Sequence, residues 1–141
     1  MSDVHEGAIG DPIPAALPPG VHRLRSQEPS SAVADLLERA GWAVSVVDLA
    51  EAADKAAIME RFVAGLALPA WFGRNWDALT DALRDLGWWP AGPRGRVIVV
   101  RGAGRMDTGT PGDRATLRAV LADGAASWAA TGTPLVILLR R

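Results

Sequence analysis

The sequence predicts an α/β fold in which a small three-stranded parallel sheet is packed with helices, with an extra helix and an arm before it. Three short apolar segments, at 42–49, 96–101 and 135–139, are rich in β-branched residues, as strands are. Amphipathic segments separate them, and strands that alternate with helices form parallel sheets through right-handed crossovers. At 141 residues the chain holds one domain, which we place at 30–141, after an arm at 1–29.

The expected arm is rich in proline. It contains Pro12, Pro14, Pro18, Pro19 and Pro29. Because proline interrupts helices and cannot donate a hydrogen bond to a sheet, we predict a loose arm that contacts the domain through Leu17 and Val21. Both histidines, His5 and His22, lie in this arm, and we expect them to be exposed to solvent rather than catalytic or metal-binding.

Two helices are predicted before the middle of the chain. Ser30 or Ser31 would cap the first, which ends at Gly41. Asp54 would cap the second. The apolar side chains of the second helix recur every three or four residues and are Ile58, Met59, Phe62, Val63 and Leu66. This spacing is typical of a helix face buried in a core.

The segment 66–89 combines an aromatic loop with a short helix. The loop holds Trp71 and Phe72, and Asn75 would cap the helix by accepting a hydrogen bond from a free amide of the first turn. One apolar stripe follows, formed by Trp76, Leu79, Leu83 and Leu86. We expect Gly87 to end this helix.

In the last third of the chain, the sequence predicts a strand, a helix and a second strand. The run 97–100 is apolar throughout, which is typical of a strand covered on both faces. Thr110 would cap a helix with Pro111 in its first position, running to about Ala130 and burying Trp128. The strand at 135–139 would close the sheet.

The polar face of the helix after Asn75 carries an unusual charge pattern. Asp77, Asp81 and Asp85 follow one another at i, i+4 and i+8, where carboxylates repel each other. The positive end of the helix dipole stabilises Asp77 in the first turn but helps Asp81 much less. From the residues alone, a solvated face and a binding surface both stay open.

The segment L-A-L-P-A-W-F-G-R-N-W-D-A-L-T-D-A-L, at 66–83, resembles the signature of the barstar family, intracellular protein inhibitors of secreted ribonucleases of the barnase type. The resemblance covers about 42–141. It implies a barstar-like α/β fold whose aromatic loop and acidic helix face together occlude a ribonuclease active site. By position, it implies a set of partner-binding residues: Trp71, Gly73, Asn75, Asp77, Thr80 and Asp81.

The chain departs from the family pattern in two places. A tryptophan is usual at the position of Thr80, and the family's helix before the last strand offers acids, whereas 124–131 has none here and only Asp123 is near. The resemblance implies that Asp81 takes the place of a substrate phosphate, with Asp77 beside it. Asp85, which we expect to be farthest from the aromatic loop, should matter least.

The residues give no sign of catalysis or of a cofactor. The chain has no cysteine, which excludes disulfides and thiol nucleophiles. No phosphate-binding loop, serine-hydrolase motif or zinc motif occurs. Gly102 and Gly104 form only a fragment of a dinucleotide loop, and aspartates spaced along a helix do not converge on a metal ion. We therefore expect a protein that is not an enzyme and binds no metal or cofactor.

Charge is divided unevenly along the chain. Residues 1–93 hold 13 acidic and 7 basic side chains, whereas 94–141 hold 8 arginines and 3 aspartates. The acidic first part suits a basic partner, which the resemblance implies to be a secreted or toxin ribonuclease, whereas the basic last part could suit an acidic partner instead. No apolar run reaches the roughly 18 residues of a membrane span, and no signal peptide is evident, so we expect a cytoplasmic immunity protein that is monomeric when free.

A second function class stays open. Exposed tryptophans next to Arg74 and Arg84 could stack on the bases of single-stranded RNA. The alternative to a ribonuclease inhibitor is therefore an RNA-binding or general protein-interaction module that uses these tryptophan and arginine side chains.

Overall fold

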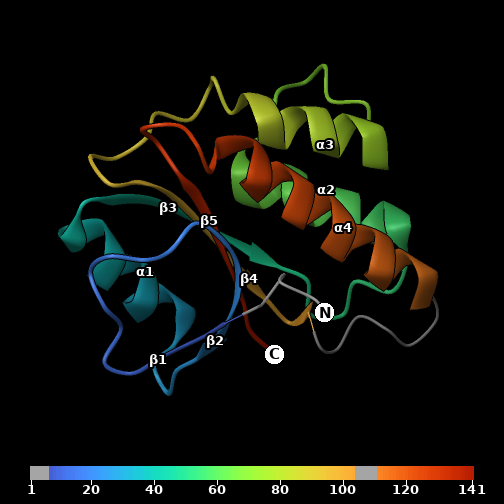
Figure 1. Cartoon of the computed structure of the whole chain (residues 1–141). Helices are drawn as coiled ribbons and strands as arrows, with labels where there is room; N and C mark the ends of the chain where they lie inside the picture. The colour runs from blue at the N-terminus through green and yellow to red at the C-terminus, as the bar shows by residue number, and fades with distance from the viewer. Residues whose placement is uncertain (1–6, 104–110) are drawn as a thin grey trace, which may run out of the picture.

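The structure, a computed structural model, describes residues 7–103 and 111–141. Its centre is a parallel sheet of five strands in the order β1-β2-β5-β4-β3 (Figure 1). The strands are β1 (Ala8–Gly10), β2 (Gly20–Arg25), β3 (Trp42–Asp48), β4 (Gly95–Arg101) and β5 (Leu135–Leu139). The predicted α/β class and parallel sheet are confirmed, and both faces of β4 and β5 are buried, as their apolar sequences require.

The predicted number of three strands is wrong, because the first 29 residues add two. β2 pairs with β5 from Gly20 opposite Val136 to Arg23 opposite Leu139, and β1 pairs with β2. Four of the five prolines lie in the connection between β1 and β2, where they interrupt no strand pairing. Residues 7–29 are therefore not a loose arm. Whether 30–141 folds without them stays a prediction.

The helices form a layer on each face of the sheet (Figure 1). Helix α1 (Ser30–Ala40) packs on one face, together with Ile13, Leu17 and Leu24 from the N-terminal segment. Helices α2 (Lys55–Leu66), α3 (Trp76–Asp85) and α4 (Pro111–Trp128) cover the other face. The larger of the two apolar cores lies beneath these three helices.

The helix ends follow the local sequence in most places. Asp54 accepts a hydrogen bond from the backbone N–H of Ala57 at 2.8 Å, which confirms the predicted cap of α2. Gly41 ends α1 in the left-handed conformation, with φ of 112°. No serine caps α1, however, because the residue before its first turn is Pro29, which offers no side-chain hydrogen bond.

Two further boundaries differ from the prediction. Helix α3 ends at Leu86 in the left-handed conformation, with φ of 52°, one residue before Gly87. The reason is tertiary, since Leu86 is fully buried in the core and its side chain holds the turn there. Helix α4 ends at Trp128 rather than near Ala130, and its predicted cap, Thr110, lies outside the described residues.

His22 corrects another expectation. It is only 8% exposed, because alternate side chains of β2 point inward. Its Nε2 lies 2.9 Å from the carbonyl oxygen of Pro18 and 3.1 Å from that of Pro19, so this nitrogen carries the proton and donates. His5 lies outside the described residues.

Across 7–103 and 111–141, no helix is long and apolar enough to cross a membrane, and no cluster of three or more acids or histidines could hold a metal ion.

Candidate partner-binding surface

The cap of α3 fixes the junction between the aromatic loop and the helix. The side-chain oxygen of Asn75 accepts a hydrogen bond from the N–H of Ala78 at 2.7 Å, as the sequence predicted. Its side-chain nitrogen donates to the carbonyl oxygen of Gly73 at 3.3 Å. A Cβ at Gly73 would lie 3.4 Å from this nitrogen and from the Cβ of Ala78, an ordinary van der Waals contact, so Gly73 contributes to the cap through its carbonyl oxygen. Asn75 and Gly73 therefore shape the loop.

The two aromatic residues of the loop have opposite environments. The backbone N–H of Phe72 bonds to the carbonyl of Pro69 at 3.0 Å, and this turn directs its ring into the core, where it is 3% exposed. The ring of Trp71 is 67% exposed. It touches the edge of Trp88, with 6.4 Å between ring centroids and an interplanar angle of 87°. An exposed tryptophan held by one ring contact is suited to bind a partner.

Asp77 and Asp81 project from successive turns of α3 and are exposed. Within the described residues, no hydrogen bond or ion pair holds either carboxylate. Trp71, Asp77 and Asp81 together are called the α3 surface below. Its carboxylates are accessible to a cationic partner, because no hydrogen bond or ion pair within the described residues must first be broken, although the charge of Asp81 also acts on Arg84.

Asp85 lies in a different setting from the other two acids. Its carboxylate accepts a hydrogen bond from the N–H of Gly87 at 3.1 Å at the end of the helix. The contact between Trp71 and Trp88 also brings the aromatic loop to this end of α3. That Asp85 is farthest from the loop stays a prediction, and its bond to the chain sets it apart from Asp77 and Asp81.

Thr80 and Asp123 are largely occupied within the molecule. The hydroxyl of Thr80 donates to the carbonyl oxygen of Trp76 at 3.0 Å, one turn earlier on α3. Asp123 of α4 accepts two hydrogen bonds from Arg84, at 2.9 and 3.1 Å. These bonds, together with the charges of Asp123 and Asp81, raise the pKa of Arg84. The one acid that α4 offers near this surface is thus neutralised by Arg84.

The rear of α3 is fixed to α4 by close packing. A Cβ at Gly124 would lie 2.8 Å from the Cβ of Leu83, so α3 approaches α4 more closely than a larger residue would allow. The indole N–H of Trp128 donates to the carbonyl oxygen of Leu83 at 2.8 Å. These contacts hold the helix in one position beneath its exposed acids.

Arg96 is a positioning residue that the sequence analysis missed. It is 8% exposed and lies at the start of β4. Its guanidinium donates to the carbonyl oxygens of Trp89, at 2.7 Å, and Leu86, at 3.3 Å, and lies 4.9 Å from the ring centroid of Trp128. Burial lowers its pKa. The one signal in the sequence was a charged residue opening an apolar run, close to two tryptophans.

The fold and this surface define an α/β protein that displays acids on a closely packed helix and a tryptophan on the loop before it. The chain matches the family model described as Barstar (barnase inhibitor) over residues 42–140, and it therefore belongs to this family. The match confirms the resemblance and its predicted extent. It begins at β3, so β1, β2 and α1 precede the matched region. A comparison with curated proteins gives no match.

Proposed function

We propose that this chain inhibits a basic ribonuclease by placing the α3 surface in the enzyme's active site. The observation that carries the proposal is the pair of exposed, unpaired carboxylates on α3 in a member of the barnase-inhibitor family. A ribonuclease active site holds phosphate with cationic side chains, and a carboxylate satisfies the same donors without being cleaved. Asp81 would take the phosphate position, with Asp77 beside it.

The rigidity of α3 supports this role. Ordering a flexible segment on binding costs free energy, whereas α3 is already held by Leu83 against α4 and by Arg96 at its C-terminal end. Trp71 would pack on the rim of the active site, where a large rigid ring contributes most to affinity. Gly73, Asn75 and Thr80 would belong to the contact surface, with Asn75 and Gly73 acting mainly through the shape of the loop.

The proposed inhibitor is an immunity protein that acts in the cytoplasm, is monomeric when free, and needs no cofactor and no catalysis. The paired state of Asp123 favours a contact on α3 and the aromatic loop over one on α4. RNA binding is the rival function, and the 67% exposure of Trp71 favours it. Against it, both arginines near the loop are paired, Arg74 with Glu60 and Arg84 with Asp123.

The test measures inhibition of RNA cleavage and the dissociation constant with barnase and with other basic secreted ribonucleases, using Asp77→Ala, Asp81→Ala and Asp85→Ala. Asp35→Ala is the matched control, since Asp35 is an exposed acid of α1 on the other face of the sheet. We expect Asp81→Ala to cost at least about 2 kcal/mol of binding free energy, as hot-spot truncations do. Asp77→Ala should follow, and Asp85→Ala should cost less.

The stability of the Asp81→Ala variant gives a further test, because it separates a binding surface from a face that is only solvated. As a solvated face, α3 would gain slightly in stability when Asp81 is removed, because repulsion from its neighbours falls. Equal, small binding losses at all four positions would contradict the proposal. Tight RNA binding at about 200 mM salt, where phosphate contacts weaken, without inhibition of any ribonuclease, would favour the rival.

A further inference from the structure

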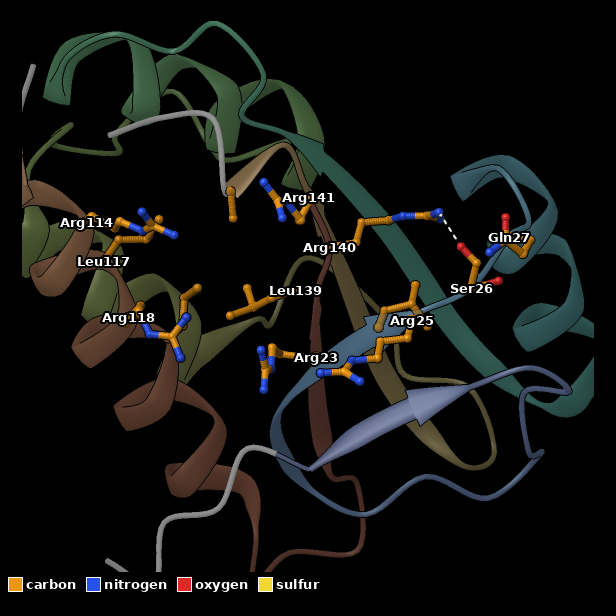
Figure 2. A pocket seen from close by; sticks show the side chains of 13 residues that line it. Arg23, Arg25, Ser26, Gln27, Arg114, Leu117, Arg118, Leu139, Arg140 and Arg141 are labelled. Atoms are coloured by element: carbon orange, nitrogen blue, oxygen red, sulfur yellow. Dashed lines mark hydrogen bonds between the residues drawn. The ribbon is translucent and has the colours of Figure 1, made fainter. Parts of the chain in front are cut away.

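A second charged region lies away from the α3 surface. A cavity of about 1060 Å³ is lined by residues from β2, α4 and the end of β5 (Figure 2). Six of these side chains are arginines: Arg23, Arg25, Arg114, Arg118, Arg140 and Arg141. None of the described residues lining it is acidic. We call this cavity the arginine pocket.

The topology of the sheet creates the pocket. All strands are parallel, so the carboxyl ends of the adjacent strands β2 and β5 meet at one edge. The chain leaves β2 toward α1 on one face and leaves β4 toward α4 on the other. Strand β5 lies between β2 and β4, and its carboxyl end faces the gap that these two diverging connections leave. In open α/β sheets, ligands bind at the carboxyl ends of the strands where connections pass to opposite faces.

The helix α4 presents different side chains to its two neighbours. Arg114, Leu117, Arg118 and Leu121 recur at helical spacing and line the arginine pocket. Gly124 and Trp128 contact α3 instead. The pocket therefore lies along the N-terminal half of α4 and the contact with α3 along its C-terminal half, and the pocket shares no residue with the α3 surface.

The guanidinium groups are not all engaged by the protein. Arg140 donates to the carbonyl oxygen of Ser26 at 3.1 Å and to the hydroxyl of Ser30 at 3.4 Å, and Figure 2 shows it turned toward Ser26. Over the described part of the chain, the side chains of Arg23, Arg25 and Arg141 form no hydrogen bond or ion pair. The carboxylate of Asp11 accepts hydrogen bonds from Ser26 and Gln27 of the pocket wall and offsets part of the charge of Arg140.

The geometry points to a binding site for a small ligand that carries two or more linked phosphate groups. Arginine forks match phosphate oxygens in pairs, and several guanidinium groups around one cavity call for more than one negative charge. Figure 2 shows Arg114 and Arg118 projecting from α4 toward Arg23, across the floor at Leu139. A cavity of this volume fits a small molecule, whereas single-stranded RNA is bound along a basic groove with stacking aromatic side chains, and none of the described lining residues is aromatic.

Inorganic pyrophosphate and ATP are the probes, titrated calorimetrically into the full chain at fixed ionic strength. We expect saturable binding of both, weakened at least tenfold in the double variant Arg23→Gln and Arg25→Gln. Both side chains are exposed, so the variant should keep its melting temperature. The matched control removes two other exposed arginines, with Arg39→Gln and Arg94→Gln, and should bind like the parent protein.

Several outcomes would overturn the inference. Absence of saturable binding, or an equal loss in the control, would show that the arginines only raise the general positive potential. Orthophosphate binding as tightly as pyrophosphate would exclude a site for linked phosphates. A short RNA that displaces pyrophosphate and binds more tightly would identify the pocket as a nucleic-acid contact. None of these results bears on ribonuclease inhibition, because the two regions share no residue.

Discussion

The α3 surface and the arginine pocket are opposite in charge and also in shape. The carboxylates of the first stand out from a helix, with Trp71 beyond them, and no neighbour encloses them. The arginines of the second surround a cavity. A charge that projects from a helix can enter a partner's cleft, whereas exposed arginines around an open cavity can converge on a ligand that sits between them. Shape together with sign supports the proposed protein partner for the first region and the proposed small anion for the second.

The largest expected effect comes from removing one wall of the arginine pocket. Deleting residues 1–25 removes β2 and the buried side chains of Ile13, Leu17 and Leu24. Each such side chain stabilises the fold by about 1.5–3 kcal/mol, so we expect a loss of several kcal/mol in the free energy of unfolding. Chemical denaturation measures it. A melting temperature equal to that of the full chain would show that 30–141 is an independent domain.

The aromatic loop gives a sharp internal contrast at two adjacent positions. Phe72→Ala should cost about 3–5 kcal/mol of stability, because the ring is fully packed. Trp71→Ala should leave stability nearly unchanged and weaken ribonuclease binding instead, since its ring is exposed. Denaturation and binding measured on both variants check this. Similar stability losses at both positions would mean that Trp71 belongs to the core and not to the α3 surface.

The contact between α3 and α4, which holds the α3 surface in place, can be tested by its contribution to stability. Gly124→Ala forces a Cβ to within 2.8 Å of the Cβ of Leu83, which cannot rotate away. We expect a net loss of about 1–3 kcal/mol in stability, larger than the gain of up to about 1 kcal/mol that alanine gives a helix. Gly112→Ala is the matched control, since nothing lies within 4 Å of its Cβ. Denaturant midpoints of the two variants should move in opposite directions.

The smallest expected effect on stability comes from Asp11, whose carboxylate bonds to Ser26 and Gln27 in the wall of the arginine pocket. Hydrogen bonds from the N–H of Gln27 and the hydroxyl of Ser26 lower the pKa of Asp11 in the folded state. The stabilisation is therefore present above the unfolded-state pKa of about 3.9 and is lost as the pH falls through the lower folded value. Asp11→Asn should lower the melting temperature slightly at neutral pH.

The difference in melting temperature between the parent protein and Asp11→Asn should vanish at low pH. Melting temperatures of the parent protein and of Asp11→Asn should converge as the pH is lowered from 7 to 3, while Asp35→Asn, which makes the same charge change on α1, should follow the parent throughout. A gap that widens toward low pH would contradict the proposed hydrogen bonds.

Local signals in the sequence predicted the helices beneath the α3 surface. Asp54 and Asn75 cap their helices as expected, because a cap involves only the next three residues. The exposure of Trp71, Asp77 and Asp81 also followed from helical periodicity and loop composition. The partner of Asp123 was not foreseen, since Arg84 lies on a different helix.

The arginine pocket could not be predicted in this way. Its residues come from β2, α4 and the end of β5, and only the pairing of β2 with β5 brings them together. That pairing joins segments more than 100 residues apart, and the many prolines between β1 and β2 suggested a loose arm instead. The turn at Leu86 was missed for a related reason, because core packing and not glycine sets its conformation.

The position of β2 has a consequence for self-association. Without it, β5 would form an edge of the sheet, with a row of unpaired backbone groups on a strand of five apolar residues. Such an edge is a template for pairing with a second copy of the chain and for aggregation. In the described sheet, β2 covers β5, and the edge passes to β1, a strand of three residues. The two strands that precede the family region thus replace an apolar edge strand by one of three residues, which offers few backbone groups for pairing with another chain.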